Sequence, residues 1–225
     1  MMKMIKKNWW KILTVVLLLY TVAGGLVLEV PRLAILNETI RALFFHVPMW
    51  FGMMILLVVS VVYAIKYLAN PTDRNDAIVV EYASIGVLFG ILGILTGMIW
   101  ANYTWGSPWS GDPKQNGSAI ALLIYLAYFV LRNSLEDKQQ RGRISAVYNI
   151  FAFATLIPLL FILPRLTDSL HPGSGGNPAF DAYEYDNQLR LVFYPSIIAW
   201  TLMGVWMASL RIRLRTIQHK INSKF

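Results

Sequence analysis

Residues 77–101 read AIVVEYASIGVLFGILGILTGMIWA, an apolar run in which Glu81 is the only charged side chain. A helix of this length rises about 38 Å, more than the roughly 30 Å of hydrocarbon in a bilayer. Comparable runs occupy residues 9–28, 43–68, 113–131, 144–163 and 191–210. A soluble domain of 225 residues would not tolerate so many long apolar runs. The sequence therefore predicts an all-α integral membrane protein, a bundle of six transmembrane helices.

The overall composition agrees with this fold class. Hydrophobic residues make up 56% of the chain and charged residues 14%, and the mean hydropathy is +0.52. The fourth run is the weakest, because its first turn contains the polar residues Lys114 and Gln115. The first run follows several lysines, as in a signal peptide, but no small-x-small cleavage site follows it. The Trp9, Trp10 pair is typical of an interfacial anchor, so we expect an uncleaved first helix.

The distribution of lysine and arginine predicts the orientation. With six spans both termini lie on one side of the membrane, and that side carries fifteen of the 20 Lys and Arg residues. Because cytoplasmic segments are enriched in these residues, we expect both termini to be cytoplasmic. The net charge of +8 is then mainly a topology signal, with the lipid bilayer as a partner and no nucleic acid. We expect one membrane domain, residues 1–225, with outer loops at 102–117 and 165–190 and a basic cytoplasmic tail at 211–225.

A tryptophan-rich loop, WGSPWSGDPK at residues 105–114, joins the third and fourth runs on the outer side. His46 lies at the outer end of the second run and His171 lies in the long outer loop, whereas His219 falls in the tail. Indole rings beside a few charges suit a flat, amphiphilic, anionic ligand, and neutral imidazole is a good axial ligand for haem iron. The chain has no cysteine, which excludes a disulfide and a covalently attached haem. We therefore expect non-covalent haem b, with both outer histidines as candidate iron ligands.

The remaining candidate residues each have a second interpretation. Trp105 and Trp109 would contact the porphyrin, but tryptophan is also an ordinary residue of membrane interfaces. Asp112 precedes a proline and could be simply a helix N-cap, or it could orient the loop or a ligand histidine. Arg41 and Lys114 are candidate cations for the haem propionates, since Arg offers a bidentate fork and Lys a point charge. Only the convergence of these residues at one membrane face favours a ligand site.

The loop resembles the tryptophan-rich "WWD" signature of the CcmC/CcsA family, the haem-handling proteins of cytochrome c maturation. The likeness extends over most of the chain, because span number, orientation and a histidine in each flanking outer loop also agree, and the six-span CcmC branch fits best. The resemblance implies that His46 and His171 are the axial ligands and that the tryptophan loop cradles the haem edge. One departure is Gly111, where the family usually carries a further tryptophan. Either a smaller platform suffices or another aromatic residue, such as Trp100 or Tyr103, replaces it.

The resemblance also implies a role and partners. The protein would hold haem at the periplasmic face of the bacterial cytoplasmic (inner) membrane and pass it to a membrane-anchored, CcmE-like haem chaperone. ABC-transporter-type subunits, CcmA/CcmB-like, would help to release the loaded chaperone. Asp112-Pro113-Lys114 leans towards the haem-handling subunit of the second maturation system, which stays an alternative. A b-type electron-transfer protein is another, although it usually requires histidine pairs within spans.

Other functions have less support in the sequence. A solute transporter needs polar groups near the midplane, and these spans offer almost none. We find no phosphate loop, hydrolase triad or H-E-x-x-H and expect no enzymatic activity. Glu81 is expected to snorkel to the interface, and Pro158 and Pro195 to kink their spans. Small residues at helical spacing are expected to allow close packing of the third span: Gly86, Gly90, Gly93 and Gly97.

Overall fold

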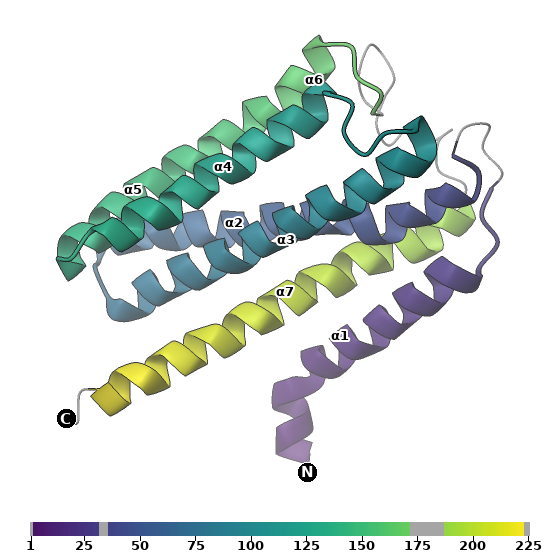
Figure 1. Ribbon diagram of the computed structural model, residues 1–225. Helices are drawn as coiled ribbons and strands as arrows, with labels where there is room; N and C mark the ends of the chain where they lie inside the picture. The colour runs from purple at the N-terminus through teal and green to yellow at the C-terminus, as the bar shows by residue number, and fades with distance from the viewer. Residues whose placement is uncertain (1, 32–35, 172–186, 223–225) are drawn as a thin grey trace.

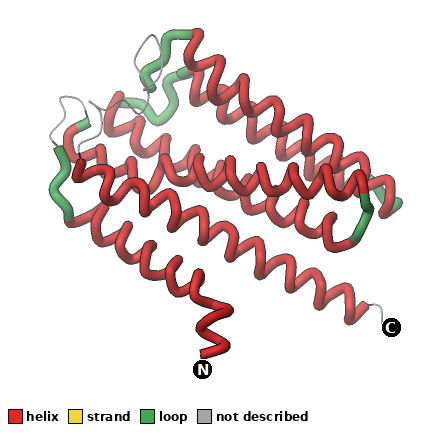
Figure 2. Tube along the Cα trace, turned by 180° about the vertical axis from the view of Figure 1, so that it is seen from behind, coloured by secondary structure: helices red, strands yellow, loops and turns green. Residues whose placement is uncertain are grey.

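The computed structural model describes residues 2–31, 36–171 and 187–222. For residues 2–7 and 219 it describes the backbone alone. Within these ranges the chain is helical and contains no strand (Figures 1 and 2). The elements are α1 Met2–Val27, η1 Asn37–Ala42, α2 Leu43–Ala69, α3 Asp73–Trp105, α4 Pro113–Ser134, α5 Lys138–Ile157, η2 Pro158–Ile162, α6 Leu163–Leu166 and α7 Asn187–Asn222. Among these described residues, six helical segments are long and apolar enough to cross a membrane, which confirms the predicted number of spans. The chain is a multi-pass membrane protein.

The antiparallel helices α2 and α3 form the centre of the bundle and pack more extensively than any other pair. The α4–α5 pair covers one side of this centre, and α7 followed by α1 covers the other (Figure 1). Helix α1 begins and α7 ends at the end of the bundle that also holds the α2–α3 and α4–α5 turns (Figure 1). The tryptophan loop, residues 106–112, lies at the opposite end, which we call the tryptophan-loop end.

The glycines of α3 allow the close packing that the sequence predicts. A Cβ atom on Gly86 would lie 2.8 Å from Leu57 of α2, and one on Gly90 would lie 2.5 Å from Leu122 of α4. Real Cβ atoms essentially never approach so closely, so larger residues here would push the helices apart. The small-residue spacing is therefore a packing signal.

Buried polar groups cross-link the helices. Asn149 of α5 donates a hydrogen bond of 2.8 Å to the Ser60 hydroxyl of α2, which donates one of 2.7 Å to the Val79 carbonyl of α3.

The expectation that Glu81 snorkels is wrong. Its side chain is only 8% exposed, and Arg211 of α7 donates to it at 2.5 Å. An ion pair with a neighbouring helix keeps the carboxylate inside the bundle, because a buried charge requires a partner.

Helix ends differ from the predicted boundaries for local reasons. Gly106, with φ of +77°, ends α3 in a left-handed turn, and the Asp112 side chain caps α4. The outer loop is thus shorter than the predicted 102–117. Pro158 begins the π-helical turn η2, as expected for a proline that interrupts a span, and Pro195 lies inside α7. Helix α7 continues through residue 222, so most of the predicted tail is helical.

Candidate functional site

The carboxylate of Asp112 is the centre of the tryptophan-loop end. Asp112 precedes Pro113, the first residue of α4, and its Oδ1 accepts a hydrogen bond of 2.8 Å from the Lys114 backbone N–H. It is therefore the helix cap that the Asp-Pro sequence predicts. Its side chain is only 2% exposed, which is unusual for a surface cap. Burial of this carboxylate requires further donors.

Those donors come from the segment after α6. The Leu170 backbone N–H donates to Asp112 Oδ2 at 2.7 Å, and the Ser169 hydroxyl donates to the same oxygen at 2.8 Å. The Nδ1 atom of His171 lies 2.9 Å from Asp112 Oδ1. Asp112 thus caps α4 and also holds the segment that carries a candidate ligand, so both interpretations of this residue apply.

This contact fixes the tautomer of His171. An ionised carboxylate can only accept, so the His171 Nδ1 must carry the hydrogen and donate it to Asp112. The lone pair of the neutral ring then lies on Nε2. Carboxylate–histidine pairs of this kind orient metal-ligating imidazoles and raise their basicity. Asp112 therefore leaves the Nε2 atom of His171 with a free lone pair, as in histidines that bind metals.

The protonation states suit this arrangement. Burial disfavours the charged form of Asp112, but the hydrogen bonds from Leu170, Ser169 and Lys114 and the His171 ring outweigh it and hold the pKa of this carboxyl below its ordinary value. Burial lowers the pKa of His171 below its ordinary value; Asp112 opposes this shift and Lys114 adds to it. A neutral imidazole beside an ionised carboxylate is the pair that a metal ligand requires.

Trp105 covers one side of His171. It is the last residue of α3, and its ring centroid lies 4.9 Å from the imidazole at an interplanar angle of 70°. Gln115 of α4 fixes the following loop, since it accepts from the Ser110 backbone N–H at 3.0 Å and donates to the Pro108 carbonyl at 3.2 Å. Trp109, within this fixed loop, is 37% exposed. The two tryptophans therefore differ, with one against the histidine and one at the surface.

His46 lies in the first turn of α2 and faces α3. Its Nδ1 is 3.1 Å from the Thr96 hydroxyl, and that hydroxyl donates to the Leu92 carbonyl at 2.7 Å. Since the hydroxyl hydrogen is used in this way, the His46 Nδ1 is the donor and the lone pair lies on Nε2. Trp50 and Trp100 approach the ring edge-on, with centroids at 6.3 and 5.7 Å. Both histidines thus have the same tautomer.

The two histidines lie at the same end of α3, because His46 contacts Trp100 and His171 contacts Trp105, five residues further along that helix. The charge of Lys114 acts on His171 from the first turn of α4, in the same neighbourhood. Among the described residues no group of three or more His, Cys, Asp and Glu side chains could hold a bare metal ion. Two imidazoles and several indoles instead fit a metal that already has a macrocycle around it. Of the candidate cations, Lys114 lies within this neighbourhood.

Arg41 is placed differently. Its Nη1 donates to the carbonyls of Gly25 and Leu28, at 3.1 and 2.6 Å, and its Nε donates to Glu38 at 2.8 Å. These bonds satisfy the last carbonyls of α1 and connect α1 to η1. Arg41 therefore joins α1 to η1, and the Nε and Nη1 donors that make these bonds do not contact the histidines.

Comparison with known proteins identifies the family. The model of the family CcmC, described as Heme exporter protein C, matches residues 1–225. The chain belongs to this family. A Heme exporter protein C from Bradyrhizobium diazoefficiens is 26% identical over 193 residues, which cover 83% of this chain and 70% of that protein.

Cytochrome c biogenesis proteins named CcsA are also similar. The protein from Pelargonium hortorum is 36% identical over 118 residues, 52% of this chain and 36% of its own length. That from Synechococcus sp. (strain CC9902) is 35% identical over 85 residues, 38% of this chain and 28% of its own length. The chain thus spans about a third of the length of these CcsA proteins. One set of relatives is named for haem export and the other for cytochrome c biogenesis, which together support a role in haem handling in cytochrome c biogenesis.

Gly111 is the position where this chain departs from the family signature. Its φ is +75°, in the left-handed region, and no atom lies near the place of a Cβ. A tryptophan would have space here but would strain the backbone. Of the two aromatic residues considered as replacements, Trp100 contacts His46, whereas Tyr103 is 74% exposed.

Sequence reasoning missed several residues of the site. Trp50 was hidden in an apolar run, Gln115 was noted only as a polar residue that weakens the fourth run, and Ser169 has no sequence signal of its own. Thr96 did have one, because it is the only hydroxyl residue between Ser84 and Asn102. A lone hydroxyl at the depth of a candidate ligand is a signal that could have been used.

Proposed function

We propose that this protein binds haem at the outer face of the bacterial cytoplasmic membrane, with His46 and His171 as axial ligands of one iron. The observation that carries the proposal is the buried Asp112–His171 pair beside Trp105, at the end of α3 where Trp100 contacts His46. Each histidine has Nδ1 engaged by the protein, which leaves the Nε2 lone pair for the iron. Haem b, held without covalent bonds, fits this set of donors.

Other contacts would hold the macrocycle. The indole of Trp105 offers a flat apolar surface at His171, and Trp50 and Trp100 offer edges at His46. Lys114 supplies a positive charge for a propionate, because it lies near both imidazoles. Trp109, which is exposed, would close over the edge of the haem or contact a partner.

The lysine and arginine distribution supports an orientation with both termini in the cytoplasm and the tryptophan-loop end in the periplasm. The absence of cysteine makes this orientation easy to test. In Asn102→Cys, an exposed position of the tryptophan-loop end, an impermeant maleimide should label intact cells. In Gln139→Cys, exposed at the other end, it should label only opened cells. The reverse pattern would contradict the orientation and the proposed haem face.

We further propose that the protein is a carrier and has no catalytic role. It would pass haem to a membrane-anchored, CcmE-like chaperone, with CcmA/CcmB-like ABC-type subunits helping release. The two ligands lie on separate segments, one in α2 and one after α6, so movement of a single segment would open the site. A crosslink between residue 171's segment and the tryptophan loop should therefore block transfer while leaving haem bound.

The direct test is the optical spectrum of the purified protein after addition of hemin. The wild type should show the sharp bands of a six-coordinate, bis-histidine haem. His46→Ala and His171→Ala should each lose them, whereas His219→Ala, on the distal part of α7, should keep them. A colourless wild type, or equal loss in all three variants, would contradict the proposal.

A second candidate is a subunit of the other maturation system. The higher local identity to CcsA, 36% over 118 residues against 26% over 193 for the haem exporter, favours it in this region. Transfer of haem to a purified chaperone supports the first candidate, and transfer only to a cytochrome c synthase partner supports the second. Reversible oxidation by a quinone without any transfer would instead support a b-type electron-transfer protein.

A further inference from the structure

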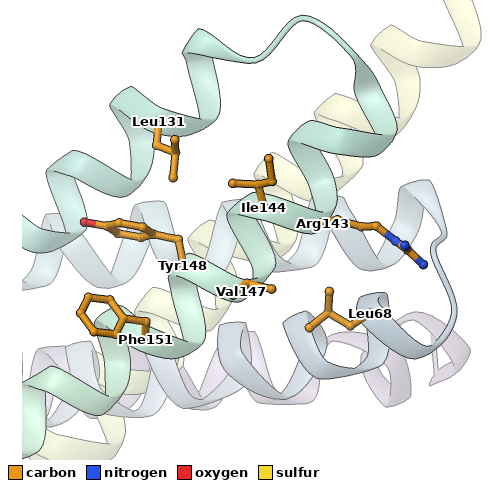
Figure 3. Close-up of a pocket in the computed structure, with 7 residues that line it drawn as sticks. All are labelled: Leu68, Leu131, Arg143, Ile144, Val147, Tyr148 and Phe151. Carbon is orange, nitrogen blue, oxygen red and sulfur yellow. The ribbon is translucent and has the colours of Figure 1, made fainter.

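A groove on the surface of the bundle lies near the α2–α3 and α4–α5 turns, at the end opposite the tryptophan loop (Figure 3). Its volume is about 650 Å³, within the range of roughly 300–1,000 Å³ that is typical of ligand pockets. Helix α5 forms its floor, and single residues of α2 and α4 form its sides. The lining residues are Leu68, Leu131, Arg143, Ile144, Val147, Tyr148 and Phe151.

The groove is amphipathic along its length. Figure 3 shows the rings of Tyr148 and Phe151 at one end and the guanidinium of Arg143 at the other. Arg143 lies in the second turn of α5, so it is near the membrane surface, and Phe151 is about 12 Å deeper along the helix. The Tyr148 hydroxyl donates to the Ile124 carbonyl, so this side chain presents only its ring to the groove.

Arg143 lacks the ion pair that two nearby cations make. Arg132 and Lys138 pair with Asp76 and Asp73 at 2.5 and 2.8 Å. Within the described part of the chain Arg143 has no carboxylate partner, and its side chain is exposed. The guanidinium of Arg143 is therefore available to an anionic ligand at the polar end of the groove.

We propose that this groove binds one anionic phospholipid, with an acyl chain along Ile144, Val147 and Phe151 and the phosphate on Arg143. A guanidinium fork matches phosphate oxygens, and the apolar walls match a hydrocarbon chain. A free phosphate would leave the apolar walls uncovered, and a neutral lipid would leave the cation unpaired. The site is independent of the proposed haem site.

The charge test compares two lipids that differ only in the head group. Native mass spectrometry of the full chain in mild detergent should show one phosphatidylglycerol retained about fivefold more strongly than phosphatidylcholine with the same acyl chains, as expected for one cation at the surface. Arg143→Gln should remove this preference. Arg213→Gln, an exposed arginine of α7 outside the groove, should keep it. Equal losses in both variants would mean diffuse attraction and would overturn the site.

The groove test fills the apolar floor. Val147→Trp, at a position that is 58% exposed, should lower retention of both lipids by at least about fivefold. Ile198→Trp, on the exposed face of α7, should not. Glycerol phosphate, which has the head-group chemistry without chains, should not compete with phosphatidylglycerol. Competition by glycerol phosphate, or no effect of Val147→Trp, would contradict a lipid ligand.

Discussion

The two candidate ligands are held by opposite means. His46 lies in a regular helix, packed between two tryptophans, and its ring nitrogen contacts the neutral Thr96 hydroxyl. His171 lies in a non-helical segment after α6, and its ring nitrogen contacts the buried carboxylate of Asp112. Packing thus positions the first histidine, whereas hydrogen bonds to one carboxylate position the second.

This difference has consequences for binding and release. A carboxylate raises the basicity of an imidazole more than a hydroxyl does, so His171 should be the stronger iron ligand in its held position. The position of His171, however, depends on the Asp112 carboxylate, which accepts hydrogen bonds from four donors. If the segment of His171 moves away from Asp112, the ring is no longer held. His46 cannot move without repacking α2 against α3. We infer that His46 is the fixed half of the site and His171 the half that opens.

The largest effect is expected when the carboxylate is neutralised. Asp112→Asn keeps the shape and the α4 cap but gives His171 a neutral partner. Loss of such a partner typically costs about 10–100-fold in metal affinity, so we expect haem affinity to fall within this range. Titration of the apoprotein with hemin, followed by absorbance, measures it.

Asp137 provides the matched control. It caps α5 at the other end of the bundle, with Oδ1 accepting from the Gln140 backbone N–H at 2.6 Å. Asp137→Asn should therefore leave haem affinity unchanged. If both variants lose haem equally, the loss does not come from the Asp112–His171 contact and the comparison of the two halves fails.

The fixed half can be disturbed through Gly97. A Cβ atom on this residue of α3 would lie 2.6 Å from Cε1 of His46, so Gly97→Ala must displace the ring. Overpacking of this kind costs about 1–3 kcal/mol, and we expect about a tenfold loss of haem affinity. Gly204→Ala, where the added methyl would meet Leu56 at 2.7 Å, should lower the thermal stability alone. Unchanged haem binding in Gly97→Ala would place His46 outside the site.

A smaller effect on haem affinity is expected from removal of the Thr96 hydroxyl. Thr96→Val keeps the side-chain shape but removes the partner of His46 Nδ1, at a cost of about 1 kcal/mol for a neutral hydrogen bond, or about fivefold in haem affinity. Thr96→Ser should restore the affinity, because it restores the hydroxyl. If Thr96→Val lost as much affinity as Asp112→Asn, the hydroxyl would support His46 as strongly as the carboxylate supports His171. That result would contradict the difference between the two histidines.

The fold was predictable where its signals are local. The six apolar runs appear in the sequence without any knowledge of packing, and the described residues contain six membrane-length helical segments to match. The sequence did not predict that Glu81 is buried, because its partner Arg211 is 130 residues away. The extent of α7 was missed for a similar reason, since its polar part continues the helix beyond the apolar run.

The site was predictable as a set of residues at one end of the bundle, but its contacts were not. Counting spans places His46 and His171 at one face. Their partners are 50 and 59 residues away in the chain, so no local pattern identifies them. Arg41 was a candidate partner for a haem propionate, but its donors contact the end of α1 and Glu38. Side-chain pairing across helices depends on their rotation, which the apolar pattern leaves open.

The smallest and most specific effect concerns pH. Iron binds neutral imidazole, so protons compete with haem for His171. Burial lowers the pKa of His171 below its ordinary value, and Lys114 acts in the same direction while Asp112 opposes it. Wild-type protein should therefore keep haem as the pH falls from 8 to the ordinary histidine value of about 6.5, and release it below that.

Asp112→Asn removes the one influence that raises this pKa, so the pKa of His171 falls further. In a plot of haem affinity against pH, the pH at which the affinity begins to fall should then be lower than in the wild type, even though the affinity at pH 8 is weaker. A carboxylate that only fixes the loop would lower the affinity by the same factor at every pH and leave the shape of this curve unchanged. Parallel hemin titrations of both proteins between pH 8 and 5 separate these outcomes, and a curve that begins to fall at higher pH in Asp112→Asn would contradict the Asp112–His171 pairing.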